Sequence, residues 1–209
     1  MTNYVVVTSD DLQPLTLHLF DQYWKPLKEK HPDLRVTFFV APFNREVGQG
    51  SENDISFSEK FKQWYRENKN WCEVEIHGLD HTKPPENQRS YEEQKEIIES
   101  AVGALWDYVD PSCIGYKAPF YREDENTLKI LNELGFAWHS QWWTLIPLKT
   151  INKKMPQILE IGTHTNMPSL KNPDNIDVFY EQLDHHLTFL KQRGFKIVTL
   201  RDIMKEVMQ

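Results

Sequence analysis

Short apolar runs alternate with amphipathic runs along the 209-residue chain, and this alternation limits the folds open to it. Strands that alternate with helices build a parallel sheet, because each helix carries the chain back to the edge where the next strand begins. About seven β/α units suit a barrel or a doubly wound open sheet. The strand-like runs are YVVVTS (4–9), LRVTFFVAP (34–42), WCEVEIH (71–77), CIGYKAP (113–119), FAWHSQWW (136–143), QILEIGTH (157–164) and FKIVTL (195–200).

The clearest helix is expected over residues 90–109. Ser90 and Glu93 form a capping box, in which each side chain accepts the other's backbone N–H. Apolar side chains then recur at helical spacing until a proline ends the run. Two further helices, 124–135 and 178–194, each end at a glycine directly before a Phe-led strand, which is a common joint in α/β folds.

The composition excludes several classes of protein. A formal net charge of −7 without any basic run argues against nucleic-acid binding, which depends on clustered Lys and Arg. No apolar run approaches the roughly 18 to 20 residues that span a bilayer. The N-terminus lacks a positive leader followed by a long apolar region, and Cys72 and Cys113 lie in strand-like runs as expected of buried thiols. These features predict a cytoplasmic protein, and the absence of linkers predicts a single domain over residues 1–209.

Ionisable side chains follow four of the predicted strands, at the point where each strand ends. The carboxyl ends of parallel strands meet at one edge, and the active sites of α/β proteins form there. We therefore expect these side chains to converge on one mouth. They are Asp10 and Asp11 after the first run, His77 and His81 after the third, Lys117 and Phe120 after the fourth, and His164 at the end of the sixth.

Asp11, His77 and His81 have the chemistry of a metal site. Two neutral imidazoles and one carboxylate leave positions open for water on a divalent ion such as zinc. Gly78 allows the tight bend that would bring both rings to one point. Each motif alone also has a plainer interpretation, because an Asp-Asp pair can be a solvated turn and two nearby histidines can both lie in a loop. A metal beside a free carboxylate, Asp10, and a separate histidine suits metal-assisted hydrolysis.

Four motifs in this order resemble the polysaccharide deacetylase family, also called carbohydrate esterase family 4, with its nodulation-factor deacetylase homology domain. They are TSDD after the first strand, HGLDH after the third, KAPF after the fourth and GTHT near the end. The resemblance spans about residues 4–200. It implies a distorted barrel of seven β/α units with parallel strands, one divalent metal that is most often zinc, and removal of N- or O-acetyl groups from sugars. Asp11, His77 and His81 match the family's metal ligands.

The resemblance also implies catalytic roles. Asp10 matches the family's general base, His164 its general acid, and the backbone N–H of Phe120 its oxyanion donor. Lys117 stands where the family usually has an arginine that holds the base, and a lysine offers a point charge without a two-pronged fork.

The fifth strand departs from the family in a second way. Family members usually carry an aspartate there that tunes the acid histidine, whereas this chain has FAWHSQWW. His139 or Ser140 could substitute for the missing acid. The two departures predict a divergent member of the family.

Tryptophans near the end of the fifth run are candidates to stack on a sugar ring. Trp142 and Trp143 are adjacent, and neighbours in a strand point opposite ways, so at most one would face the mouth. Trp138 and Trp106 are expected in the core.

The predicted function is metal-dependent hydrolysis that removes acetyl groups, chiefly N-acetyl, from a sugar, glycoconjugate or short saccharide. Two alternatives remain open: a catalytically silent relative that binds saccharide, and another mononuclear metal hydrolase. Phosphoesterases that use two metals need more ligands than the sequence offers. The sequence makes no prediction of the oligomeric state.

Overall fold

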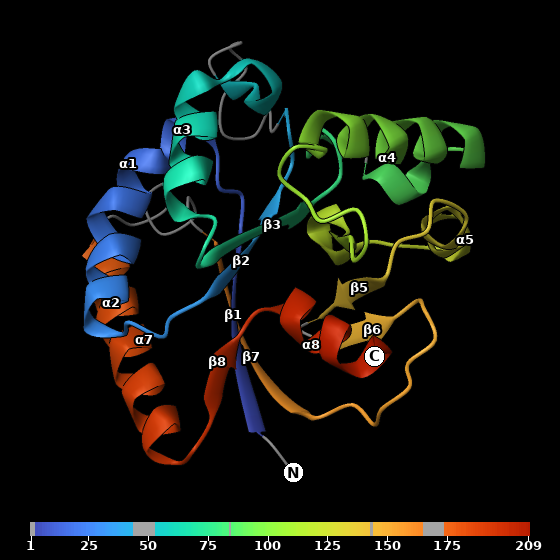
Figure 1. Cartoon of the computed structure of the whole chain (residues 1–209). Helices are drawn as coiled ribbons and strands as arrows, with labels where there is room; N and C mark the ends of the chain where they lie inside the picture. The colour runs from blue at the N-terminus through green and yellow to red at the C-terminus, as the bar shows by residue number, and fades with distance from the viewer. Residues whose placement is uncertain (1–2, 44–52, 84, 143, 165–173) are drawn as a thin grey trace.

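Eight strands form one sheet that curls into a nearly closed barrel (Figure 1). The computed structural model describes residues 3–43, 53–83, 85–142, 144–164 and 174–209, without the side chains of 174 and 175. The strands are β1 (Asn3–Asp10), β2 (Val36–Val40), β3 (Cys72–Ile76), β4 (Gly115–Lys117), β5 (Trp138–Gln141), β6 (Thr144–Pro147), β7 (Gln157–His164) and β8 (Lys196–Val198).

Helices connect the strands, and the capping box at Ser90 and Glu93 begins α4 as the sequence predicts. The longer helices are α2 (Lys25–Lys30), α3 (Glu59–Asn68), α4 (Tyr91–Leu105), α5 (Glu125–Glu133), α7 (Asp174–Gln192) and α8 (Leu200–Met208). A short α1 (Leu17–Leu19) runs into α2 through a π-turn at Phe20–Trp24, and 3₁₀ turns cover Pro14–Thr16, Ile55–Phe57, Glu86–Gln88 and Pro119–Tyr121. None of the described helices is long and apolar enough to cross a membrane.

The strand order is β6-β5-β4-β3-β2-β1-β7, and β8 pairs with the first part of β1. All pairings are parallel except that of β6, which runs antiparallel to β5 at one edge. The predicted α/β barrel is therefore confirmed, and β6 is an addition to it. No separate strand was predicted for β6, because it follows β5 within one apolar, Trp-rich stretch.

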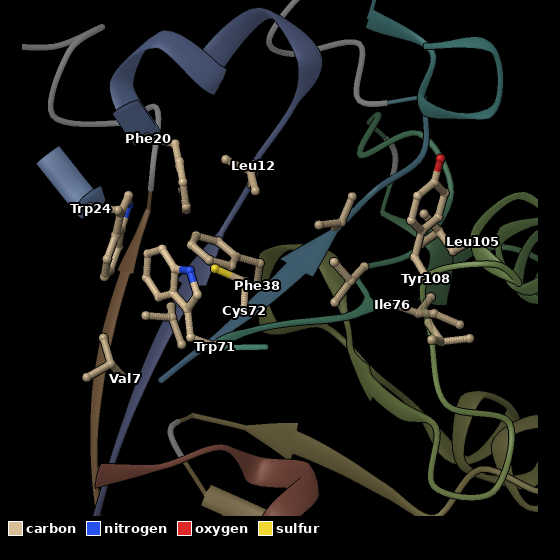
Figure 2. Packing of buried hydrophobic residues seen from close by; sticks show 14 of the residues in the cluster. Val7, Leu12, Phe20, Trp24, Phe38, Trp71, Cys72, Ile76, Leu105 and Tyr108 are labelled. Carbon is tan, nitrogen blue, oxygen red and sulfur yellow. The ribbon is translucent and has the colours of Figure 1, made fainter. Parts of the chain in front are cut away.

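Alternation along each strand separates an outer face from an inner face. The outer face packs against the helices in a large apolar cluster, in which Val7 and Phe38 meet Phe20, Trp24 and Trp71 (Figure 2). Figure 1 shows α2 and α7 together over one part of the sheet and α4 and α5 over another. The helices thus bury the outer face and leave the inner face to form a second cluster.

The inner face is filled from below by α8. Leu200, Ile203, Met204 and Val207 of this helix cluster with Tyr4, Val6, Phe39 and Trp138 of the strands. Arg201 enters the same space and donates to Glu75 Oε1 from both Nε (2.9 Å) and Nη2 (2.7 Å). Burial raises the pKa of Glu75 to about 8 against the opposing charge of Arg201. Helix α8 therefore plugs this end of the barrel, and the candidate site residues lie at the other end, where the strands finish.

The predicted core is correct for Trp138, which is fully buried, and wrong for Trp106, which is 51% exposed. Helix α4 ends at Leu105 and not at residue 109, so Trp106 has left the buried stripe of the helix. Cys72 and Cys113 are buried free thiols, as predicted.

Gly115 tests the packing inside the barrel. A Cβ at this position would lie 2.0 Å from Cζ2 of Trp138, so Gly115→Ala must displace a buried indole. We expect a loss of about 1–3 kcal/mol in the free energy of unfolding, measured by chemical denaturation. Gly103→Ala in α4 is the control, because a Cβ there meets nothing within 4 Å and should stabilise the helix by about 0.5–1 kcal/mol. Equal stability of the two variants would contradict this packing.

Candidate metal centre and active site

The predicted site residues lie at the carboxyl ends of four strands. Asp10 is the last residue of β1 and stands in register with His164, the last residue of β7. His77 directly follows β3, and Lys117 ends β4. The topology therefore brings together side chains that are up to 154 positions apart in the sequence, as the difference between 164 and 10 shows.

Asp11, His77 and His81 converge in one buried cluster. Each offers a ligand atom, and the three atoms lie within 4.8 Å of one another. Nε2 of His81 is 3.9 Å from Oδ1 of Asp11. A divalent ion with bonds of about 2.0–2.2 Å to nitrogen and oxygen fits between atoms at this separation.

The hydrogen bond of His77 leaves the ring ready to bind a metal. Nδ1 of His77 lies 2.8 Å from the carbonyl oxygen of Lys117. Because a carbonyl only accepts, Nδ1 carries the proton, and Nε2 keeps its lone pair for a ligand. Burial lowers the pKa of His77 to about 3, so the ring is neutral at physiological pH. The donor set therefore fits a divalent ion such as zinc.

A buried glutamate fixes the loop between the two histidines. Oε1 of Glu86 accepts from the backbone N–H of Leu79 (2.9 Å), and Oε2 accepts from the hydroxyl of Tyr116 (3.0 Å). Gly78 has a φ of +67°, and a Cβ there would lie 2.4 Å from Oε1 of Glu86. The loop can therefore approach Glu86 only with glycine at this position. Nothing in the sequence singled out Glu86, because it lies in a polar stretch without periodicity.

Asp10 and Lys117 form an ion pair inside the barrel. Nζ of Lys117 lies 2.9 Å from Oδ1 of Asp10, and both side chains are 1% exposed. Burial lowers the pKa of Lys117, but the charge and hydrogen bond of Asp10, together with Tyr121 and Glu160, outweigh this effect and leave the pKa raised. The ammonium also lies 4.9 Å from the centre of the Phe39 ring and 5.0 Å from that of Tyr121. Lys117 thus contacts the Asp10 carboxylate from the position where the family usually has an arginine.

The second oxygen of Asp10 faces the candidate acid. Nε2 of His164 lies 3.7 Å from Oδ2 of Asp10, and this oxygen accepts no hydrogen bond from the described residues. His164 is the more accessible partner, with a side chain that is 28% exposed. Asp10 therefore contacts Lys117 through one carboxylate oxygen and faces His164 with the other.

The fifth strand does not replace its missing acid with His139. Register pairs His139 with Tyr116 on the outer face of the sheet, and Nδ1 of His139 lies 3.0 Å from Oε2 of Glu123. Ser140 pairs in register with Lys117 and is fully buried. Strand β5 therefore places the hydroxyl of Ser140 inside the barrel.

A carboxylate that the sequence did not single out lies in β7, next to β1. Glu160 in β7 accepts from the hydroxyl of Thr8 (2.8 Å). Burial raises the pKa of Glu160, while the charge of Lys117 lowers it. The ammonium of Lys117 thus lies in the field of two carboxylates, Asp10 and Glu160.

Backbone strain gathers at the same mouth. Among the described residues, five non-glycine positions have φ between 47° and 64°: Asp11, His81, Phe120, Tyr121 and Trp142. Such conformations cost of order 1–3 kcal/mol each and persist where the surroundings enforce them, often at active sites. Two of the five are metal-ligand candidates and a third is the candidate oxyanion donor, so strain and predicted chemistry coincide.

Aromatic rings line one side of the mouth. Tyr121 and Trp142 stack with ring centres 4.9 Å apart and an interplanar angle of 16°, and Trp142 is 59% exposed. The ring of Phe120 lies against that of His81, with centres 4.4 Å apart. Trp143, the other candidate for sugar stacking, lies outside the described residues.

Sequence comparison identifies no relative of this chain. No protein-family model matches it, and no curated protein matches it.

Solved structures match it over nearly its whole length. The Xyl-CE4 domain of a multidomain xylanase from the hindgut metagenome of Trinervitermes trinervoides is similar with a TM-score of 0.64 and 14% identity, covering 99% of this chain and 91% of that one. The chitin deacetylase of Colletotrichum lindemuthianum is similar with a TM-score of 0.59 and 17% identity, over 96% and 86% of the two chains.

A third match is a CE4 family pseudoenzyme from Bacillus anthracis, with a TM-score of 0.56 and 15% identity over 97% of this chain and 66% of that one. At these identities the likeness concerns the fold. The resemblance seen in the sequence motifs is therefore confirmed at that level: this chain has the barrel fold of the CE4 polysaccharide deacetylases.

Proposed function

We propose that this protein is a divergent metal-dependent deacetylase that removes acetyl groups, chiefly N-acetyl, from a sugar, glycoconjugate or short saccharide. One observation carries the proposal. A buried Asp-His-His cluster lies beside a second carboxylate, Asp10, that is held by Lys117 through one oxygen and leaves the other toward His164. This combination supplies a metal site, a base and an acid in one mouth of a CE4-type barrel.

Asp11, His77 and His81 would hold the ion, with zinc as the expected metal. When bound, a divalent cation polarises a carbonyl and lowers the pKa of water from about 15.7 to about 7. The burial of the three side chains excludes other ligands from their side of the site. The neutral tautomer of His77 is already set by the carbonyl of Lys117.

Asp10 and His164 would move the protons. Water attacks the acetyl carbonyl carbon while Oδ2 of Asp10 takes a proton from the water, and Lys117 stabilises the carboxylate through Oδ1. The N–H of Phe120 donates to the developing oxyanion. As the C–N bond breaks, His164 gives a proton to the amine nitrogen, because an amine anion is a very poor leaving group. The products are acetate and the free amino sugar.

The stacked pair of Tyr121 and Trp142 would contact the sugar. Trp142 presents an exposed indole next to the site, and the apolar faces of pyranose rings pack on such surfaces. This position favours a saccharide over a small acetylated metabolite without a ring.

A silent saccharide-binding protein is the second candidate function. The lysine at 117 and the hydroxyl at Ser140 depart from the family pattern, and one structure with this fold is a pseudoenzyme. Acetate release from short N-acetylated saccharides by the zinc-loaded protein separates the two candidates. We expect release that stops with a chelator and returns with zinc. Saccharide binding without acetate release would favour the silent protein.

Removal of a ligand should remove the metal. We expect His77→Ala to lose most of its zinc by elemental analysis, since two remaining ligands bind a divalent ion poorly. His185→Ala on the exposed surface of α7 is the control and should keep about one ion per chain. Unchanged zinc in His77→Ala would remove this residue from the ligand set, and two ions per chain in the parent would contradict a mononuclear site.

Removal of the base or the acid should leave the metal in place. Asp10→Asn and His164→Ala are each expected to lower kcat by roughly 10²- to 10⁴-fold with zinc content unchanged. Loss of zinc from Asp10→Asn would mean that Asp10 is a ligand. Full activity of His164→Ala on an amide substrate would assign the acid role to another residue.

Loss of the glutamate behind the metal loop should weaken zinc binding. Glu86→Ala frees the Leu79 N–H and the Tyr116 hydroxyl, so the strained loop loses its support. We expect zinc affinity to fall roughly 10- to 100-fold, measured by competition with a chromophoric chelator. Glu29→Ala on the exposed side of α2 should bind zinc as the parent does. Equal affinities in the two variants would contradict a supporting role for Glu86.

A further inference from the structure

We infer that Glu123, His139 and Gln141 form a clamp that holds Phe120 and Tyr121 in their left-handed backbone conformation and so positions the oxyanion donor. The inference rests on the proposed function, because only a deacetylase needs the Phe120 N–H at a developing oxyanion. None of the three clamp residues matches a catalytic motif, and the sequence indicated no role for Glu123 or Gln141.

Two successive residues are strained in this loop. Phe120 has a φ of 59° and Tyr121 a φ of 56°, a conformation that disfavours each L-residue by about 1–2 kcal/mol. The turn bonds Tyr121 N–H to Ala118 O (3.0 Å) and Arg122 N–H to Pro119 O (3.2 Å) span three residues. A right-handed 3₁₀ turn makes bonds of the same span, so these bonds do not select the left-handed form.

The clamp supplies contacts from a different element. Nε2 of Gln141 donates to the carbonyl oxygen of Tyr121 (3.2 Å). Nδ1 of His139 lies 3.0 Å from Oε2 of Glu123, and these side chains are only 4% and 10% exposed. Because a carboxylate accepts and His139 and Gln141 are two apart in β5, both side chains donate from one face of the strand.

Both ends of the loop are anchored independently. The carbonyl of Lys117 accepts from His77, and the carboxylate of Asp124 caps α5 by accepting from the N–H of Thr127 (2.8 Å). The clamp is therefore not needed to end β4 or to start α5. It acts on the residues between the anchors, where the ring of Phe120 lies against His81.

Glu123 and His139 form a polar pair at a buried position that apolar side chains could also fill. Replacing both partners of a buried hydrogen bond by apolar groups of the same shape can be nearly neutral or stabilising, so stability alone does not require Glu123 and His139. Accurate placement of the Phe120 N–H does require such a pair, since misplacement of a catalytic group by about 1 Å can lower a rate by about 10²-fold.

Hydrogen exchange tests the clamp without any assay of turnover. We expect His139→Ala and Glu123→Ala to speed amide exchange at least tenfold in peptides that cover residues 118–124, with zinc content unchanged. His31→Ala is the matched control, because His31 is also buried and lies 2.7 Å from a carboxylate, Asp184, between α2 and α7. It should leave exchange at 118–124 as in the parent. Unchanged exchange in both clamp variants would overturn the inference.

Kinetics test the consequence for the oxyanion. We expect His139→Ala to lower kcat roughly 10- to 100-fold while KM stays within about twofold, and the double variant with Glu123→Ala to lose no more than either single change. His139→Asn keeps an N–H donor near the Nδ1 position and should retain most of the parent kcat. Independent, multiplicative losses in the double variant, or no rescue by His139→Asn, would overturn the inference. A parent without acetate release would refute the proposed function, while the exchange result would still decide whether the clamp exists.

Discussion

The buried lysine at the end of β4 connects the two chemical halves of the site. Its ammonium holds Oδ1 of Asp10 across the barrel, and its backbone carbonyl fixes the proton on Nδ1 of His77. One residue thereby orients both a free carboxylate and a metal-ligand candidate. Lys117 is 1% exposed, and among the described residues the carboxylates of Asp10 and, at longer range, Glu160 compensate its charge. The barrel interior is built around this arrangement, with Phe39 and Tyr121 packed against the ammonium.

Much of the fold followed from local patterns. The seven apolar runs all contain strands, because β-branched and aromatic residues repeat there at strand spacing and polar turns separate them. The capping box at Ser90 predicted the start of α4. Strand β6 lacked such a signal. Helix α8 was not predicted, although Thr199 and Asp202 form a capping box at its start and apolar residues recur along it at helical spacing. The place of α8 depends on Arg201 finding Glu75 inside the barrel, which is a contact between distant parts of the chain.

The residues of the candidate site likewise fall into those that the sequence predicted and those that it did not. Asp10, Asp11, His77, Lys117 and His164 were predictable because topology places strand ends together, whatever the details of packing. Glu86, Glu123 and Glu160 were not, since their hydrogen bonds go to residues that only the folded chain brings near. Left-handed backbone at Phe120 and Tyr121 was equally hidden, because neither residue type favours it. Sequence motifs thus predicted the groups that gather at the strand ends, while the side chains that contact and orient them emerge from tertiary structure.

Strand β1 is the first strand of the chain, yet it pairs with three other strands, β2, β7 and β8. Along its length it pairs with β7, and its first residues pair with β8, so two of its three neighbours come from the last quarter of the sequence. Loop-closure entropy must be overcome before such distant pairings contribute stability, and folds rich in them form slowly. During synthesis on the ribosome, Asp10 and Asp11 would therefore be made well before residues 157–198. The barrel that buries them could close only after those residues were added. Until then the acidic pair would be exposed to solvent, and a polar strand end of this kind would tolerate that exposure better than an apolar one.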